Sequence, residues 1–568
     1  MPEYLAPAVF VEETSFRAKS IEGVGTSTCS FVGLTARGPV SVKPSDPTPP
    51  LLTSFGDFER YYGGVDDLLI GTAAARNYLA LAAQAFFNNG GGRLYVARIL
   101  GAGAKAAGPT NLDDDKKIKL SARTPGGATI AGTAANYRVV ISETDLPTTQ
   151  KLALRQPAGT TIMTAPATFS VVGVDTIAAS DDPCSIVSIG ITVYDPTGPV
   201  YEAGGLGLNP KHPRFIGNVL GATPPSAADA LTNPVSLSID PTVKLKDLVA
   251  GLMKGATDGV RTVELTGGLD GTGAASTQDY QDALNSLLAL EDISIVAAPG
   301  SSTFDDTTAK AVNQMLIGHA EARRSYRIAV LDTPTGLEPT ANPSVRALKN
   351  LIDSKYAALY YPWITIANPL AATDPSQPAQ IDVPPSGAVC GIYARSDVQR
   401  GVWKAPANET VTGALGLQRD VRFGEQEVLN PLGINCIRAL PGRGIRVWGA
   451  RTISSDPEWK YVNIRRYFLY LEASIDRGTQ WAVFEPNGEA LWANVRTTVS
   501  DFLYNEWVSG ALLGSSPKEA FFVRCDRTTM TQNDLDNGRL ICLIGVAAIK
   551  PAEFVIFRIG QKTADARG

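Results

Sequence analysis

The side chains that could carry acid–base chemistry are few and scattered. The chain of 568 residues contains two histidines, His212 and His319. His319 falls on the apolar stripe of an expected helix, beside Val312 and Leu316, which favours a buried or helix-face histidine over a catalytic one. His212 lies in the turn-like segment NPKHPRF, with no cysteine or carboxylate cluster beside it. Histidine-based catalysis is therefore not indicated, and we expect a protein that is not an enzyme.

One carboxylate occupies a position typical of ligand-binding groups. Asp332 follows the apolar run Arg327–Leu331, and open α/β sheets bind ligands just outside the carboxyl ends of their strands. The glycine-rich loop Thr266–Gly273 could lie near the same sheet edge, but it lacks the glycine spacing of a dinucleotide site. A solitary aspartate more often caps or turns the chain. An α/β enzyme with a ligand site near Asp332 and this loop remains the alternative interpretation.

Cysteines and arginines also fail to form a recognisable site. The six cysteines form no CxxC pair, and we expect buried free thiols, no metal and no cofactor; they are Cys29, Cys184, Cys390, Cys436, Cys525 and Cys542. The segment RALPGRGIRVWGARTI carries four arginines around Trp448, namely Arg438, Arg443, Arg446 and Arg451. Because the formal net charge is -5, we expect an exposed hairpin face or a protein interface there and no nucleic-acid partner.

The elements that would position these groups begin with a strand and a helix. Cys29–Leu34 and Leu94–Ile99 have the composition of strands, and Asp67–Phe87 has apolar positions at helical spacing up to the stop signal NNGGG. Helices and strands then alternate after residue 242, which predicts βαβ units and a largely parallel sheet. The expected helices are Leu245–Lys254, Gln278–Leu290, Ala309–Arg324 and Ser344–Ser354, and the expected strands are Ile293–Ala297, Arg327–Leu331 and Ala357–Ile366.

Two regions differ from this α/β pattern. Residues 101–241 are rich in Ala, Gly, Thr and Pro, with short alternating runs that predict a β-rich inserted domain. Near the end, INCIRALPGRGIRVWGART predicts a hairpin, and two amphipathic helices follow. The first places Ile464, Tyr467, Phe468, Leu471 and Ile475 on one stripe, with Arg465, Arg466, Glu472 and Asp476 expected to face away; the second carries Trp492, Val495, Val499, Phe502 and Leu503.

The last apolar run poses a structural problem. Strands are expected at Ala520–Cys525, Leu540–Ile549 and Phe554–Ile559. The final strand is apolar on both faces, with Phe554 and Ile556 on one side and Val555 and Phe557 on the other. Such a strand requires burial and a partner along its edge, which either the chain or another molecule must supply.

Four motifs follow one another in the second half of the chain: PSGAVCGIYARSDVQRGVWKAPANE, LNPLGINCIRALPGRGIRVWGARTIS, WKYVNIRRYFLYLEASI and FEPNGEALWANVRTTVSDFLYNEW. Their order resembles that of the contractile tail sheath proteins of phages and phage-tail-like injection particles. The start of the chain, PEYLAPAVFVEETSF followed by GTSTCSFVGLTARGP, is similar to the start of that family. The resemblance covers about the first 100 residues and most of 245–568, and residues 101–241 carry no such motif.

The resemblance implies a structural subunit that polymerises around an inner tube and contracts to drive the tube through a target cell envelope. Its implied partners are further copies of itself in stacked rings or a helix, the tube protein, baseplate and terminator proteins, and optionally a sheath-recycling ATPase. Subunits would assemble in the cytoplasm of the producing bacterium and then form part of the particle. The N-terminus lacks a signal-like segment and no window is apolar enough to span a membrane, which argues against an exported adhesin and direct membrane insertion.

In this family, terminal arms add strands to the C-terminal domain sheet of neighbouring subunits. By position, the resemblance assigns this exchange to Ala8, Val9, Phe10 and Val11 and to Phe554, Val555, Ile556, Phe557 and Ile559. We expect acceptor strands at Cys436, Ile437 and Arg438 or at Leu540, Ile541 and Leu543. We also expect one amphipathic helix to face the tube through Arg496, Asp501, Asn505 and Glu506.

The expected fold class is α/β and α+β multidomain, with a sheath core built from N- and C-terminal parts of the chain. We expect an extended arm at 1–30, the first part of the core at 31–100 and the β-rich outer insertion at 101–241. An α/β core domain would follow at 242–384, the inner sheath domain at 385–550 and the C-terminal strand arm at 551–568.

Overall fold

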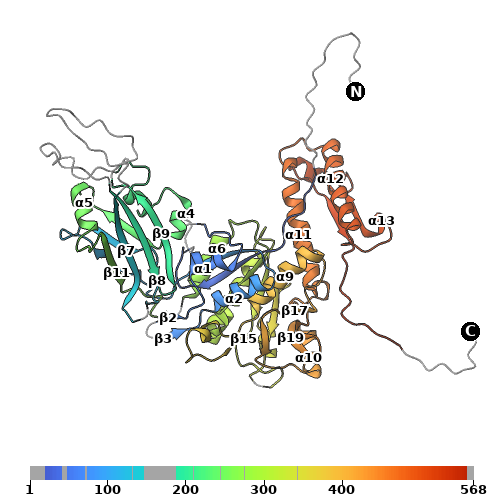
Figure 1. Cartoon of the computed structure of the whole chain (residues 1–568). Helices are drawn as coiled ribbons and strands as arrows, with labels where there is room; N and C mark the ends of the chain where they lie inside the picture. Colours follow the sequence, from blue (N-terminus) through green and yellow to red (C-terminus); the bar gives the residue numbers. More distant parts are fainter. Residues whose placement is uncertain are drawn as a thin grey trace, which may run out of the picture. The chain divides into compact units, whose positions relative to one another are not determined.

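The computed structural model describes residues 20–40, 48–70, 73–130, 132–145, 187–208, 210, 212–243, 245–273, 275–341 and 343–558. The chain divides into two compact units. The larger unit contains Thr26–Gln399 and Pro406–Lys460, and the smaller unit contains Met1–Gly25, Arg400–Ala405 and Tyr461–Gly568. Figure 1 labels their helices and strands.

An eight-stranded sheet forms the centre of the larger unit, in the order β17-β20-β19-β14-β13-β12-β1-β4. All pairs from β19 to β4 are parallel, which confirms the predicted parallel sheet, and β20 and β17 add antiparallel strands at one edge. The bounds are β1 (Thr28–Leu34), β4 (Arg93–Ile99), β12 (Ile295–Ala297), β13 (Ile328–Asp332), β14 (Ala357–Tyr361), β17 (Glu409–Thr410), β19 (Ile434–Leu440) and β20 (Gly444–Val447).

Helices cover both faces of this sheet. On one face Val32 of β1 belongs to an apolar cluster that includes Leu284 of α6 (Thr277–Leu287) and Leu316 of α7 (Asp306–Glu321). On the other face Phe31 meets the ring of Phe86 in α2 (Tyr78–Asn88) edge to face, with ring centroids 5.9 Å apart. Burial on both faces explains why the central strands are continuous apolar runs.

A glycine permits the close contact between two of these helices. Helix α9 (Ser386–Arg400) lies against α2, and a Cβ at Gly387 would come within 2.6 Å of backbone atoms of Ala82. The larger unit also contains α1 (Phe55–Tyr62), α8 (Arg346–Lys349), α10 (Phe423–Leu429), β2 (Leu68–Ile70), β3 (Ala73–Ala75), β15 (Ile364–Ala367), β16 (Gln380–Val383) and β18 (Ala414–Leu417).

The β-rich part of the larger unit has its own apolar core. A four-stranded sheet, β11-β7-β8-β9, and a three-stranded sheet, β10-β6-β5, surround a buried cluster that includes Val139, Ile191 and Leu237. The bounds are β5 (Thr110–Asn111), β6 (Ile118–Ala122), β7 (Ala135–Asp145), β8 (Val187–Asp195), β9 (Gly198–Leu206), β10 (Val235–Ile239), β11 (Val260–Thr266), α3 (Ile216–Val219), α4 (Ala227–Thr232) and α5 (Leu245–Leu252).

Two buried arginines join this β-rich part to the central sheet. Arg37 forms an ion pair with Asp195 of β8, and both side chains are buried. Arg98 of β4 donates hydrogen bonds to the carbonyl oxygens of Gly38 at 2.9 Å and Pro125 at 2.8 Å. Buried charges are stable only when they are paired in this way, so the two arginines fix the junction.

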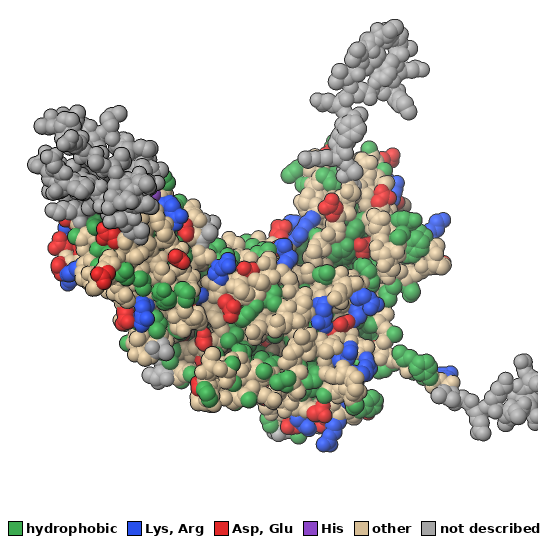
Figure 2. All heavy atoms as spheres, viewed as in Figure 1, with side chains coloured by type: hydrophobic (Ala, Val, Ile, Leu, Met, Phe, Trp, Pro, Cys, Tyr) green, Lys and Arg blue, Asp and Glu red, His purple; other side chains and the backbone are tan. Residues whose placement is uncertain are grey.

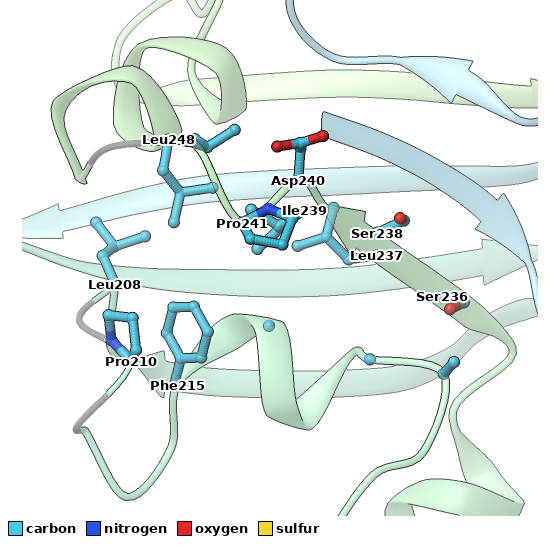
Figure 3. A pocket seen from close by; sticks show the side chains of 14 residues that line it. Leu208, Pro210, Phe215, Ser236, Leu237, Ser238, Ile239, Asp240, Pro241 and Leu248 are labelled. Atoms are coloured by element: carbon cyan, nitrogen blue, oxygen red, sulfur yellow. The ribbon is translucent and has the colours of Figure 1, made fainter. Parts of the chain in front are cut away.

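A pocket of about 410 Å³ opens in the β-rich part, beside β10 (Figure 3). Its walls are largely apolar and include Leu208, Phe215 and Leu248. Asp240 is the acidic residue of the lining, and its carboxylate accepts hydrogen bonds from the backbone N–H and hydroxyl of Thr242 at 2.9 and 2.6 Å. The pocket therefore offers a mainly apolar surface, and the carboxylate in its lining is already hydrogen-bonded to Thr242.

The smaller unit is built from two long helices and a two-stranded sheet. Helices α11 (Val462–Gly478) and α12 (Glu489–Val508) pack through a buried cluster that includes Tyr467, Leu471, Trp492, Val499 and Phe502. The antiparallel pair β21 (Phe521–Arg524) and β22 (Leu543–Val546) lies beside them, together with α13 (Pro517–Ala520) and α14 (Gln532–Asp536).

Several predicted elements need correction in their bounds. The helix expected at Asp67–Phe87 begins at Tyr78, because the side chain of Asn77 caps it by accepting from the N–H of Ala80, and β2 and β3 precede it. The helix expected at Ser344–Ser354 is the single turn α8. The strand expected at Ala357–Ile366 is divided into β14 and β15, which lie in different sheets.

The domain boundaries also differ from those expected. Helix α5 and strand β11 belong to the β-rich part beyond residue 241, because β11 pairs with β7 and Leu248 of α5 lies in the same apolar cluster. The C-terminal stretch of the smaller unit begins at Tyr461, not at residue 385, because α9 and β19 pack within the larger unit. The pattern of turn residues in the sequence could not show that β11, which follows α5, pairs with β7 of the β-rich part.

Two arginines of α11 are buried, contrary to the prediction that they face away from the apolar stripe. Arg465 and Arg466 are 2% and 3% exposed. Arg465 donates to the carboxylate of Glu472 at 2.7 Å, so its charge is paired. Helical periodicity assumes that one face meets solvent, and α11 is buried over most of its circumference.

Asp332 caps a helix and is not open to a ligand. Its carboxylate accepts hydrogen bonds from the backbone N–H of Ser386, at 2.8 Å, and from the Ser386 hydroxyl, at 2.5 Å, at the first turn of α9. Burial raises the pKa of Asp332 to about 7, although these hydrogen bonds lower it. Its structural role is thus to hold the start of α9 against the end of β13.

We predict that Asp332→Asn removes a pH dependence of stability. The folded-state pKa of Asp332 lies above its unfolded value, so the free energy of unfolding falls as pH rises from the unfolded pKa to the folded pKa of about 7. Relative to Asp332→Asn, the wild type should lose about 2–3 kcal/mol between about pH 5 and about pH 8, measured by urea unfolding. A constant difference between the two proteins would contradict this assignment.

Candidate assembly surface

The groups that could support enzymatic chemistry have structural roles. His319 is buried, and its Nε2 lies 2.6 Å from Nη1 of Arg327. Burial, followed by the charge of Arg327, lowers the pKa of His319 to about 3, so the imidazole is neutral near pH 7. His212 accepts a hydrogen bond at Nδ1 from the N–H of Arg214 at 3.0 Å, which stabilises its own turn.

The alternative ligand site is not assembled in the larger unit. Asp332 is bonded to Ser386, whereas Asp270 in the loop Thr266–Gly273 accepts from the N–H of Leu69 at 2.9 Å. That loop pairs with the chain near residue 102, and no described hydrogen bond joins it to Asp332. Among the described residues, no group of three or more His, Cys, Asp or Glu side chains could hold a metal ion.

The arginine-rich hairpin β19–β20 is engaged with its own neighbours. Arg446 donates to the carbonyl oxygen of Asn408 at 2.7 Å, and Arg443 donates to the Asn408 side chain at 2.6 Å. The guanidinium of Arg443 also lies 5.2 Å from the centroid of the Trp448 ring. These contacts organise the hairpin surface and pair its arginines within the chain.

The two-stranded sheet of the smaller unit leaves both of its outer edges open. Strands β21 and β22 pair with each other over Phe521–Arg524 and Leu543–Val546, and no third described strand joins this sheet. Alternate residues of an antiparallel strand direct their N–H and C=O groups away from the partner. Each outer edge therefore presents backbone groups that can receive another strand.

The outward face of this sheet is partly apolar. Phe521, Val523 and Val546 pack against the core of the smaller unit. The alternate residues Phe522 and Leu543 are 51% and 49% exposed. A two-stranded sheet with one apolar face in water is marginal by itself, so it is suited to extension by further strands.

The segment after this sheet is exposed and unpaired by any described strand. Residues 551–558 belong to no helix or strand, and Figure 1 shows the chain running toward its C-terminal end as an open trace. Phe554, Val555, Ile556 and Phe557 are between 68% and 83% exposed, which is unusual for four consecutive large apolar residues. In the single chain they form no strand, and Ile559 lies outside the described residues.

The structure describes only some of the residues predicted to form the exchanged arms and the acceptor strands. Ala8, Val9, Phe10 and Val11 lie outside the described residues. Leu543 begins β22, whereas Leu540 and Ile541 precede it and pack against the core of the smaller unit.

The predicted acceptor at Cys436, Ile437 and Arg438 needs correction. These residues lie in β19, within the eight-stranded sheet of the larger unit. Cys436 faces Tyr361 of β14 and accepts at its carbonyl from the N–H of Trp448, while Ile437 and Arg438 pair with β20. A strand with neighbours on both sides has no continuous edge to offer.

The candidate tube-facing residues divide between the surface and the core of the smaller unit. Asp501 and Asn505 are exposed on α12, and Arg496 is half-buried and donates to the carbonyl of Cys525 at 3.2 Å. Glu506 is buried, contrary to the prediction, and accepts from the hydroxyls of Tyr467 at 3.1 Å and Tyr470 at 2.9 Å. Its burial raises its pKa, and the two hydroxyls compensate partly.

Sequence reasoning missed further exposed apolar residues of the smaller unit. Tyr504 and Val508 extend the exposed face of α12 at helical spacing from Asp501. Phe484, before α12, is fully exposed and has a φ of 67°, which is strained for an aromatic residue. Figure 2 shows apolar side chains on the surface of this unit. The helical period contained the signal for Tyr504, but no pattern marks Phe484.

Comparison with known proteins identifies the family. The model of the phage tail sheath protein central domain matches residues 273–453, and the model of the phage tail sheath C-terminal domain matches residues 454–562. Together they span just over half of the chain. No helix in the described part of the chain is both long and apolar enough to cross a membrane.

Individual relatives agree with the family models. The chain is 28% identical over 272 residues to a prophage major tail sheath protein of Pseudomonas aeruginosa strain UCBPP-PA14, covering 47% of this chain and 64% of the relative. It is 23% identical over 307 residues to the tail sheath protein of Enterobacteria phage T4, covering 51% and 45%. The matches thus cover less than two thirds of either relative.

A solved structure supports the same fold over almost the whole length. The helical sheath of the anti-feeding prophage in its contracted state superposes with a TM-score of 0.54 at 21% identity, covering 98% of this chain and 100% of that one. The matched family domains, the ordered motifs and the shared fold lead to one conclusion. The chain belongs to the phage tail sheath protein family.

Proposed function

We propose that this chain is the structural subunit of a contractile sheath that polymerises around an inner tube and contracts to drive the tube through a target cell envelope. One observation carries the proposal: the smaller unit combines a sheet with two open edges and an exposed apolar segment that has no partner in the described chain. The open edges and the exposed apolar segment both reduce the stability of a monomer. The segment of one copy could pair with an open edge of a second copy.

Strand exchange between subunits would satisfy both features. The segment 554–559 of one subunit adds to an outer edge of the β21–β22 sheet in another, and the N-terminal run 8–11 adds to the remaining edge. A strand of this length makes on the order of four to six backbone hydrogen bonds, each contributing about 0.5–1.5 kcal/mol net. Burial of a large apolar side chain adds about 1.5–3 kcal/mol, part of which offsets the entropy of association.

Links of this kind produce an open assembly. Arm and acceptor are different surfaces of the subunit, so the contact is head-to-tail, and such contacts generate helical or stacked arrangements when they do not close. Subunits can then rotate as rigid bodies while the linked strands remain paired. Contraction is driven by new contacts between subunits, from a kinetically trapped extended state, and uses no nucleotide.

The assembled sheath has several classes of partner. It surrounds an inner tube protein, ends at baseplate and terminator proteins, and is optionally recycled by an ATPase. The subunits assemble in the cytoplasm of the producing bacterium before becoming part of the particle. The exposed face of α12, with Asp501, Tyr504, Asn505 and Val508, is the surface that we assign to the tube, and the β-rich part 101–266 is assigned to the outside.

We predict that the terminal strand is required for polymerisation but not for folding. Ile556→Pro removes a backbone donor and disfavours pairing, and deletion of residues 553–568 removes the arm. Both proteins should remain soluble and folded by circular dichroism, with at least a tenfold loss of cylinders in negative-stain micrographs.

The matched control for this experiment is Ile556→Val. Valine keeps the β-branched side chain and the backbone N–H, so cylinders should form at close to the wild-type yield. Cylinders of normal length from Ile556→Pro would contradict strand exchange through this segment.

We predict that the tube binds the exposed face of α12. Asp501→Lys reverses a charge on that face and should weaken co-sedimentation with the tube protein about tenfold, without lowering the melting temperature by more than about one degree. Asp536→Lys makes the same change at an exposed site on α14 and should leave tube binding unchanged. Equal losses for both variants would indicate a general charge effect and reject this assignment.

A further inference from the structure

Two cysteines lie next to each other at one end of the β21–β22 sheet. Arg524 pairs with Leu543 at the last position of the ladder, so Cys525 and Cys542 are the next residues in this antiparallel register. Burial and then the neighbouring Cys525 thiol raise the pKa of Cys542, as expected for two thiols that lie near each other. Both cysteines are in the reduced form in this structure.

The pairing pattern places these cysteines in a favourable position for a covalent link. The N–H of Ala547 donates to the carbonyl of Ala520 at 2.8 Å, which marks Ala520 and Ala547 as a hydrogen-bonded position of the ladder. Because hydrogen-bonded and non-hydrogen-bonded positions alternate, Cys525 and Cys542 occupy a non-hydrogen-bonded position. Paired residues at such positions typically have Cα atoms about 4.5 Å apart and close side chains, which is within the range of protein disulfides.

The other cysteines placed in the central sheet lack such a partner. Cys29 of β1 lies opposite Leu94 and Ile295, and Cys436 of β19 lies opposite Tyr361. Cys525 is fully buried in the core of the smaller unit, whereas Cys542 is only partly buried and can be reached from solvent. Cys525 and Cys542 are therefore close to each other, and a small molecule in solution can reach Cys542.

We propose that Cys525 and Cys542 form an intrachain disulfide that staples β21 to β22 when the protein meets an oxidised low-molecular-weight disulfide such as oxidised glutathione. The Cys542 thiolate attacks one sulfur of that molecule and releases one small thiol. The Cys525 thiolate then attacks the mixed disulfide and releases the second. The protein loses two protons and two electrons, which appear in the two small thiols.

The local environment sets the rate of this reaction. Burial and the neighbouring Cys525 raise the pKa of Cys542 to about 12, so little thiolate is present near neutral pH and exchange is slow. In a compartment rich in reduced glutathione the dithiol persists, and the disulfide forms where the thiol pool is oxidised. The link closes the loop 526–541 and fixes the register of the two strands.

The consequence for assembly rests on the proposed function. The stapled sheet is the one assigned to accept strands from neighbouring subunits, so oxidation holds its edges in register. A sheath whose subunits carry this link should lose subunits more slowly in denaturant. Formation of the link does not depend on assembly, so its failure and a failure of strand exchange are measured separately.

The test begins with thiol mapping on the full-length protein. The protein is incubated with excess oxidised glutathione at about pH 8.5, unfolded, alkylated and digested for mass spectrometry. We expect Cys525 and Cys542 to escape alkylation and to appear in one linked pair of peptides, while the other cysteines are alkylated. Unfolding of the smaller unit should then shift upward by about 5 °C or more, and a reductant should reverse the shift.

Matched variants complete the test. Cys542→Ala should remove both the link and the thermal shift, and because the site is half-buried the protein should keep its fold. Cys436→Ala, in the other unit, should keep both. Stable glutathione adducts on Cys542 with Cys525 still alkylated would overturn the proposal, and so would full alkylation of both thiols after oxidation.

Discussion

Every backbone N–H and C=O group at the edge of a sheet must find a hydrogen-bond partner, and the two units of this chain meet that requirement differently. In the larger unit one edge strand of the central sheet is very short, because β17 contains only Glu409 and Thr410. In the smaller unit both edges of the β21–β22 pair stay open. The open edges lie in the unit that also carries the exposed apolar segment 554–557, and the strand exchange proposed above would supply both with a partner.

The larger unit, in contrast to the open sheet of the smaller unit, is closely packed and rigid. Its central strands are buried on both faces, and its charged groups are paired where they are enclosed, as Arg37 is with Asp195 and Arg98 is with three carbonyl oxygens. A body held in this way transmits displacement without deforming, because closely packed interiors have little room to adjust. In the proposed sheath, movement between copies would then occur at the connections, where a paired strand can stay intact while the bodies rotate.

The sequence allowed the parallel sheet and the long helices to be predicted well, because their apolar periods are regular. It gave no warning that Arg465 and Arg466 are buried, since a periodic stripe assumes solvent on the opposite side of the helix. Glu506 was predicted to be exposed for the same reason, because Tyr467 and Tyr470, whose hydroxyls donate hydrogen bonds to its carboxylate, lie on another helix. The exposed terminal segment was predictable because composition alone shows that four large apolar side chains need a cover.

Stability and assembly impose opposite demands on the β21–β22 sheet. If the sheet accepts strands as proposed, its exposed Phe522 and Leu543 cost stability in the monomer, yet the sheet must hold its register for an incoming strand to meet the correct side chains. A slip by one residue would turn every side chain of the sheet to the opposite face. A covalent link at the Cys525–Cys542 end resists such a slip without occupying either outer edge, because its sulfur atoms lie on the core face and not along the ladder. The sheet can then be fixed in register and still receive a strand on each side.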